Sequence, residues 1–147
     1  MRHVLSFYGS VTTGARVTLV SVRIGFPYQV KNIRVKYALG HAGLVQHTFF
    51  VSNDDAAPTD AKPSGQNILA QYGNVDYVVG DDDVLEMRDE TFVSRMPTWI
   101  KVHAYNTDTA THTINVLITV EDFRKHPDDQ LMRELIGEEL YLERLHA

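Results

Sequence analysis

Seven histidines are the residues of this sequence best suited to chemistry near neutral pH. His41 and His47 flank one turn of the chain, and His103 and His112 flank another. Imidazole nitrogens bind zinc, iron and copper, so a pair of histidines across a hairpin supplies half of a metal site. Such a site needs at least one further ligand. The spacing therefore favours surface histidines at strand ends and leaves a metal-dependent enzyme as the weaker alternative.

Other reactive patterns are equally incomplete. Asp54-Asp55 and Asp81-Asp82-Asp83 offer the clustered oxygen atoms that calcium prefers, but neither has the spacing of an EF-hand loop. Ser64-Gly65 does not fit a nucleophile elbow, and Gly40–Gly43 is not a phosphate-binding loop. There are no cysteines, which excludes disulfides and thiolate metal sites. We predict no catalytic residue, no cofactor and no bound metal.

One strand carries a strip of residues that suits a ligand. Trp99, Lys101, His103 and Tyr105 alternate with apolar residues and would share one face of that strand. Exposed aromatic rings in a row stack on sugar rings, so a carbohydrate-binding module is one hypothesis. The same side chains would equally pack against a loop, a helix or a neighbouring subunit.

Charge is segregated along the chain. Residues 1–53 contain six Lys or Arg and no acid, whereas residues 54–90 contain ten acids and two bases. Facing strands of opposite sign would stabilise a monomer, and the same pattern would suit a self-complementary oligomer with Arg34 and Lys36 among its contacts. The basic residues are not clustered with aromatic ones, so the pattern disfavours nucleic-acid binding.

The positioning elements are mainly strands. Period-two alternation is clearest over Val30–Leu39, where Ile33, Val35 and Tyr37 alternate with polar residues. Seven to nine such segments follow one another without an intervening helix, which predicts an all-β antiparallel sandwich, jelly-roll-like or immunoglobulin-like, of about eight strands. The sandwich domain should span residues 1–123. Extended segments are expected at 2–8, 16–25, 30–39, 44–52, 68–72, 75–79, 99–105 and 112–120, and the short segments 84–87 and 91–93 are the weakest candidates for strands.

A long connection interrupts the strands. Residues 53–67 lack any periodicity and are rich in turn-forming residues. We predict an exposed loop of about fifteen residues, a length that is uncommon and often functional.

The C-terminal part, residues 124–147, changes period. Pro127-Asp128-Asp129 is a typical helix start, and the following leucines recur at near-helical spacing. We predict a short amphipathic helix over Asp128–His146 that packs either on its own sandwich or on a neighbouring subunit. The residues expected to make that contact are Leu131, Leu135, Ile136, Leu142 and Leu145.

The pattern of residues 1–120 resembles small single jelly-roll proteins of virus particles, including phage capsid decoration (cement) proteins. Three features carry the resemblance: the extended run Phe26–Val35, the segment Tyr77–Asp83 and the closing strands Trp99–Tyr105 and His112–Val120. The resemblance implies a virion structural role and carries over no functional residue. A cupin-like metal enzyme would be expected to show two histidines and an acid close together in sequence, and that motif is missing.

The combined hypothesis is a non-enzymatic homo-oligomer, with a trimer favoured, that binds a capsid or other virion protein on the particle surface. Its contacts would be the N-terminal strand, the loop Asn53–Asn67 and the C-terminal helix. No apolar run has the ~18 residues of a membrane helix, and the N-terminus lacks the apolar core of a signal peptide. We therefore expect neither a membrane partner nor a targeting segment.

Overall fold

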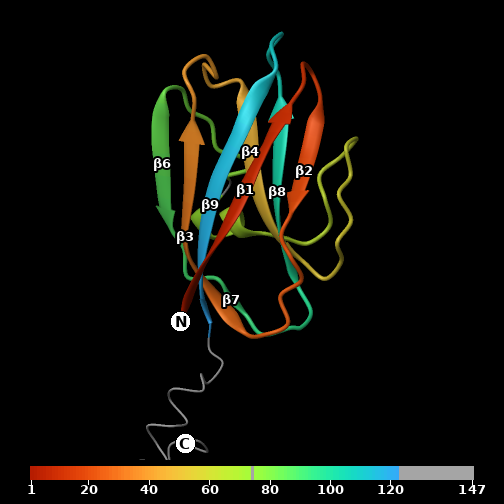
Figure 1. Cartoon of the computed structure of the whole chain (residues 1–147), viewed down its shortest axis with the longest axis vertical. Helices are drawn as coiled ribbons and strands as arrows, with labels where there is room; N and C mark the ends of the chain where they lie inside the picture. The colour runs from red at the N-terminus through yellow and green to blue at the C-terminus, as the bar shows by residue number, and fades with distance from the viewer. Residues whose placement is uncertain (74, 123–147) are drawn as a thin grey trace, which may run out of the picture.

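The computed structural model describes residues 1–73 and 75–122. The described chain forms two antiparallel sheets that face each other as a sandwich (Figure 1). Sheet A has the strand order β1-β9-β3-β6, with β7 on the same edge of β3 as β6, and sheet B has the order β2-β8-β4-β5. The elements are β1 (Arg2–Val11), β2 (Arg16–Val20), β3 (Tyr28–Tyr37), β4 (Val45–Ser52), β5 (Gln66–Asn67), the 3-10 helix η1 (Ile68–Tyr72), β6 (Asp83–Arg88), β7 (Phe92–Val93), β8 (Trp99–Asn106) and β9 (His112–Asp122).

The pairing of the strands is nested. β1 pairs with β9, β2 with β8, β3 with β6 and β4 with β5, so the first half of the chain pairs with the second half from the outside inward. A long hairpin rolled up in this way, with two four-stranded sheets, is a jelly roll. The expected all-β sandwich of jelly-roll type is therefore confirmed, and β7 adds a short ninth strand.

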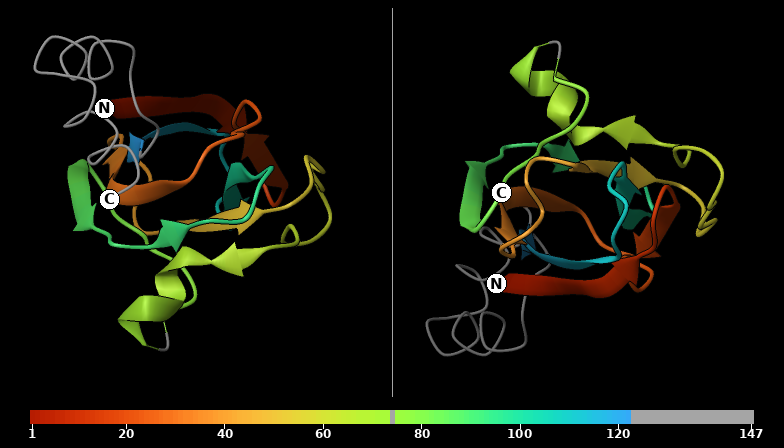
Figure 2. Two further views of the ribbon diagram at one scale, coloured as in Figure 1. Left: turned by 90° about the horizontal axis from the view of Figure 1, so that it is seen from below. Right: turned by 90° about the horizontal axis from the view of Figure 1, so that it is seen from above.

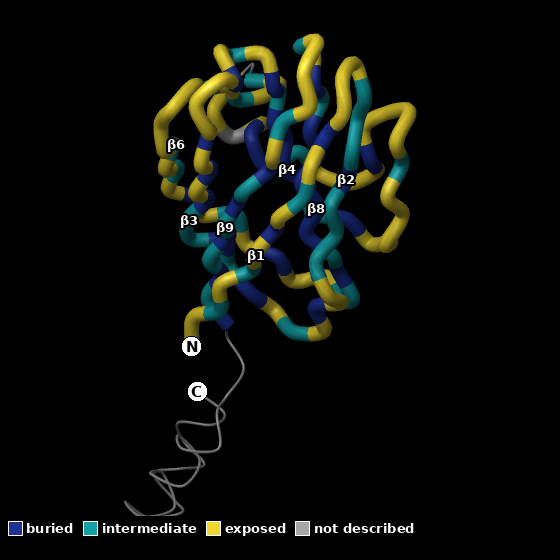
Figure 3. The backbone as a smooth tube through the Cα atoms, turned by 45° about the horizontal axis from the view of Figure 1, so that its top comes forward, coloured by how far each residue is buried: buried dark blue, intermediate teal, exposed yellow. Residues whose placement is uncertain are grey.

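The core lies between the two sheets and follows the alternation in the sequence. Every second residue of the central strands points inward and is buried, as the dark blue positions of Figure 3 show. Figure 2 shows the two sheets as two layers seen end-on. In β3 the pattern survives a bulge between Val30 and Asn32, which keeps Val30 and Ile33 both on the buried side. The buried aliphatic residues of the central strands include Val30, Ile33, Val35, Ile100, Val102, Ile114, Val116, Ile118 and Val120.

Two expected segments differ from the structure. Residues 68–72, expected to be extended, form η1, because the Asn67 side chain accepts a hydrogen bond from the Leu69 amide and caps a helical turn. Residues 75–79 were expected to form a strand, but only Val78 bridges to His47 of β4. The predicted C-terminal helix, with Leu131, Leu135, Ile136, Leu142 and Leu145, lies outside the described residues.

The predicted exposed loop is partly docked on the sandwich. It leaves β4 after Ser52 and returns through β5, which pairs with Phe50 and Val51 of β4. Gly65 makes this return possible, because its φ is +124° and a Cβ at that position would lie 2.5 Å from the Val51 carbonyl oxygen. The loop runs beside β2 at the right of Figure 1. It therefore covers part of the outer face of sheet B.

Candidate functional site

Three histidines gather inside the upper end of the sandwich as drawn in Figure 1. His47 points inward from β4, His112 begins β9, and His41 lies in the loop between β3 and β4. The rings of His41 and His112 are 4.7 Å apart between centroids. We call His41, His47 and His112 the histidine cluster. His103 and His112 flank the connection between β8 and β9, but the weaker alternative of a metal-binding pair is not met, because His103 points outward from sheet B.

His41 and His47 of the histidine cluster are buried and do not lie at the surface as expected. The Tyr37 ring lies edge-on to His41 and His47, with centroid distances of 5.8 Å and 5.2 Å. In the described part of the chain, the ring nitrogens of His41 and His47 and the Tyr37 hydroxyl find no partner within hydrogen-bond distance. Burial, followed by the nearby His41, lowers the pKa of His47 to about 4. Burial and then His112 lower the pKa of His41, while Asp81 opposes them. Both imidazoles are neutral at neutral pH.

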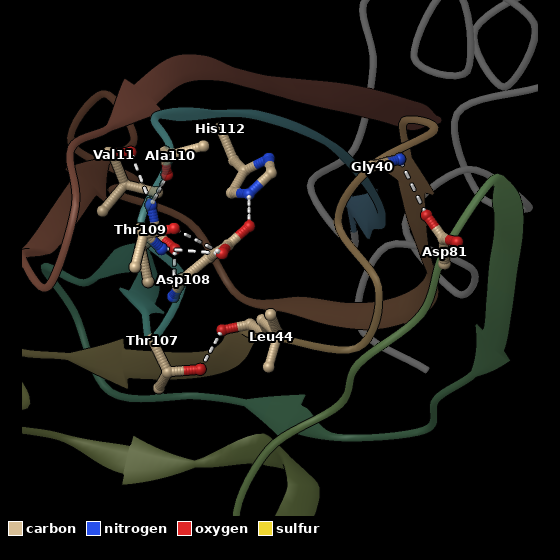
Figure 4. Close-up of polar contacts among 10 residues, drawn as sticks. Val11, Gly40, Leu44, Asp81, Thr107, Asp108, Thr109, Ala110 and His112 are labelled. Atoms are coloured by element: carbon tan, nitrogen blue, oxygen red, sulfur yellow. Dashed lines mark hydrogen bonds and ion pairs between the residues drawn. The ribbon is translucent and has the colours of Figure 1, made fainter.

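Loop contacts close this end of the molecule (Figure 4). Asp108 Oδ2 lies 2.7 Å from His112 Nε2, and this hydrogen bond is the largest cause of the lowered pKa of Asp108. The Gly40 amide donates to Asp81 Oδ1 over 2.9 Å, and the Thr107 hydroxyl donates to the Leu44 carbonyl over 2.7 Å. Among the described residues, no three His, Cys, Asp or Glu side chains converge as a metal site would require.

The predicted ligand strip does share one face of β8, and it lies under the loop. His103 is only 1% exposed and is held by two neighbours on β2. Arg16 Nη1 lies 3.2 Å from His103 Nε2, and a guanidinium only donates, so that nitrogen accepts. The other nitrogen, Nδ1, therefore donates to Thr18 Oγ1 over 3.1 Å, and Thr18 donates to the Pro58 carbonyl over 2.9 Å. Burial, followed by Arg16, lowers the pKa of His103 to about 4.

Lys101 is the most unusual member of the strip, because its side chain is 0% exposed. Its ammonium donates to Asp54 Oδ1 over 2.7 Å, and Ser64 donates to the other carboxylate oxygen over 2.6 Å. The hydrogen bond from Lys101, followed by that from Ser64, lowers the pKa of Asp54. The outer face of sheet B is therefore occupied by contacts within the chain.

The aromatic ends of the strip are half-buried. Trp99 and Tyr105 are intermediate in exposure, and the Arg16 guanidinium sits 4.1 Å from the centroid of the Tyr105 ring. Cation–π stacking of this kind uses the ring face that a sugar would need. A role for Trp99, His103 and Tyr105 in sugar binding stays a prediction.

The outer face of sheet A is different, because it is open over most of its area. Val4 and Tyr8 of the edge strand β1 are 60% and 72% exposed. The register places Val4 beside Thr119 and Asn32, and Ser6 beside Leu117 and Arg34. Lys36 follows Arg34 by two residues, so both point outward from β3 and both are exposed. The two basic residues predicted as contacts thus lie on one open face.

This face carries both bases and acids. Two of its acids pair with bases of the same face: Glu86 lies 3.6 Å from Arg34 Nε, and Glu121 lies 3.2 Å from Arg2 Nε. Both pairs are at least partly solvent-exposed and contribute little to stability. The charged residues whose register or lining position places them on this face are Arg2, Lys31, Arg34, Lys36 and Arg88, against Glu86, Asp89, Glu90 and Glu121.

Shallow hollows run between these side chains. One of about 100 Å³ is lined by Arg34, Lys36, Asn115 and Leu117. A broader one of about 700 Å³ lies toward the lower edge, lined by residues that include Lys31, Arg88 and Thr119. A further hollow of about 500 Å³ separates the loop after β4 from the segment around β7. The N-terminal strand was predicted as a contact element, but Val4, Tyr8 and Leu117 were not singled out. Val4 and Tyr8 share a parity in β1 opposite to that of buried Phe7 and Val11.

Comparisons with known proteins give distant matches only. No family model matches the chain, and no similar curated protein is found. Solved structures that match include the infectious bursal disease virus Gt strain, with 12% identity over 86% of this chain and 33% of the other and a TM-score of 0.43. A D431N mutant of VP2 of that virus, in derived T=1 particles, matches with 10% identity over 86% of this chain and 33% of the other and a TM-score of 0.45. A VP2 subviral particle of that virus matches with 11% identity over 86% of this chain and 34% of the other and a TM-score of 0.44. The chain spans about a third of the length of each.

Proposed function

We propose that this protein is a non-enzymatic structural component of a virus particle, a homo-oligomer that binds the capsid and stabilises it as a decoration or cement protein. The observation that carries the proposal is the contrast between the two outer faces of the sandwich. The outer face of sheet B is covered within the chain, through Thr18, Lys101 and His103. The outer face of sheet A leaves apolar and basic side chains in water.

An open face of this kind is an interaction surface. Monomeric proteins expose single apolar residues freely, but apolar side chains gathered with unneutralised basic ones are typical of a surface that receives a partner. In addition, β1 is a ten-residue strand at the edge of sheet A. A long edge strand pairs readily with another chain, and a closed ring removes that hazard. A trimer is the ring that we favour.

The jelly roll itself does not choose between functions, because capsid, lectin and cupin domains share it. The choice rests on the sites. The histidine cluster is closed by Asp108 and the loops around it, and Tyr105 of the sugar-binding strip is stacked under Arg16. Of the surfaces described, the outer face of sheet A is the one best prepared for a protein partner.

The solution mass of the full chain tests this proposal. Light scattering across a hundredfold dilution should give a mass that is a small fixed multiple of the protomer, three being the multiple that we favour. A full-length protein that is monomeric at every concentration would contradict the proposal and would make glycan screening the next experiment.

A further inference from the structure

The occupant of the open face can be named from the chain itself. We propose that segment 128–146 of one copy docks on the outer face of sheet A of a neighbouring copy. The inference rests on the proposed function, for which it supplies the contact that holds the oligomer together. Two properties of the face and one of the chain path support it.

The first property is charge. The outer face of sheet A carries five basic residues against four acidic ones, and Arg34 and Lys36 lie side by side with Leu117 in one hollow of it. Residues 128–146 carry six acids against Arg133 and Arg144. Opposite charges of this kind steer association and fix the orientation of the partners. The acids of the segment are Asp128, Asp129, Glu134, Glu138, Glu139 and Glu143.

The second property is apolar surface. Tyr8 and Val4 stand out of β1, and Val84 of β6 is 38% exposed at the other edge of the same face. Leu117 of β9 lies between them in the hollow beside Arg34 and Lys36. Segment 128–146 provides apolar residues in return, namely Leu131, Met132, Leu135, Ile136, Leu140, Tyr141, Leu142 and Leu145. Burying apolar groups on both sides drives association, and the charges select the register.

The chain path places the segment at this sheet. β9 is an interior strand of sheet A, and it ends at Asp122 beside His3 of β1. Residues 123–127 then separate Asp122 from the segment and span at most about 17 Å when extended. The segment can therefore begin no farther than about that distance from the end of β9. Because β9 runs toward this end of the sheet, the segment would have to turn back to cover its own sheet, and we therefore propose a neighbouring copy as the partner.

The other faces offer less room. The outer face of sheet B is occupied by the loop after β4 through Pro58 and Asp54. The upper end is closed by the contacts from Gly40, Thr107 and Asp108. The match between the acidic, apolar segment and the basic, apolar face is the best that the described surface offers.

The test uses the full chain and the absence of cysteine in its sequence. A nitroxide is attached to the variant Gln130→Cys, and that protein is mixed with an unlabelled, nitrogen-15 copy. Paramagnetic broadening of the amides of Arg34, Lys36 and Leu117 in the nitrogen-15 copy is the expected result. Amides of the loop over sheet B, such as that of Lys62, should stay sharp.

Charge reversal then separates specific docking from random encounter. The pair Arg34→Glu and Lys36→Glu in the nitrogen-15 copy should reduce the broadening at least tenfold. Adding Glu138→Lys and Glu139→Lys to the nitroxide-labelled copy should restore most of it. The matched control is Arg23→Glu, which reverses an exposed base that lies between β2 and β3. Equal broadening in all variants would overturn the inference.

The two proposals fail in different ways. If the full chain is oligomeric but no outer-face amide is broadened, the docking inference is wrong and the proposed assembly stands on other contacts. A second sample carries the nitroxide and the nitrogen-15 label on the same chain. If the protein is monomeric and broadening occurs only in that sample, the segment covers its own sheet. That result would overturn both the neighbouring copy and the proposed function.

Discussion

The two outer faces of this sandwich use similar residues for opposite purposes. Sheet B places Lys101 and His103 on its outer face and covers them with a loop that supplies Asp54 and Pro58 as partners. Sheet A places Arg34 and Lys36 on its outer face and leaves them in water. Basic strands thus serve stability on one side and remain available for assembly on the other. Substitutions on sheet B should change folding, and substitutions on sheet A should change association.

The largest expected effect is the loss of the carboxylate opposite Lys101. Asp54→Asn leaves the fully buried ammonium without its counter-charge, and an unpaired buried charge is strongly destabilising. The midpoint of thermal unfolding should fall on the order of 10 °C. The matched variant Lys101→Met removes the charge itself and should change the midpoint far less. Calorimetry of both variants checks the prediction, and equal losses would show that the ion pair is not what holds the loop.

Acid should weaken the fold through the buried histidines. Burial lowers the folded-state pKa values of His47 and His103 to about 4, from the ordinary histidine value of 6.5, so the unfolded chain binds protons first as the pH falls. This stabilisation is therefore fully present above pH 6.5 and is lost between pH 6.5 and pH 4. The cost is roughly 3 kcal/mol for each histidine. Denaturant unfolding across this range measures the slope.

The variant His47→Phe isolates one of these contributions. It should make the free energy of unfolding less dependent on pH between 6.5 and 4, because the ring next to Tyr37 no longer titrates. A slope identical to that of the unaltered protein would mean that His47 does not resist protonation in the folded state.

A matched pair of threonines gives the smallest and cleanest contrast. Thr18→Val on sheet B removes the link between His103 and the Pro58 carbonyl and should cost about 1–3 kcal/mol of unfolding free energy. Thr119→Val makes the same change on the outer face of sheet A and should stay within about 0.5 kcal/mol. Chemical denaturation of both proteins gives the comparison. Similar losses would show that the two faces do not differ in the way described.

The strands were largely predictable, because alternation is a local property. Residues such as Ile33, Val35 and Tyr37 alternate with polar neighbours, and the structure buries them in β3 as expected. The nested pairing was not predictable from local pattern. It joins residues as far apart as Arg2 and Glu121, and such contacts leave no periodic signal in a single sequence.

The sites were predicted in part. The alternation correctly placed Trp99, Lys101 and His103 on one face of a strand. It could not show that the loop after β4 would fold back over that face, because the docking depends on contacts such as Thr18 to Pro58, forty residues apart. The histidines were misassigned for a related reason. His41 and His112 meet across the sandwich, and hairpin spacing does not reveal neighbours of that kind.

The central claim is that the outer face of sheet A is an assembly surface. The most direct test is the solution mass of the full-length double variant Arg34→Glu, Lys36→Glu, compared with the control Arg23→Glu. We expect the unaltered protein and the control to be oligomeric, and the double variant to be a folded monomer. At a protomer concentration low enough for all three proteins to be monomeric, the thermal midpoint of the double variant should equal that of the unaltered protein. A double variant with the same oligomeric mass as the control would contradict the account.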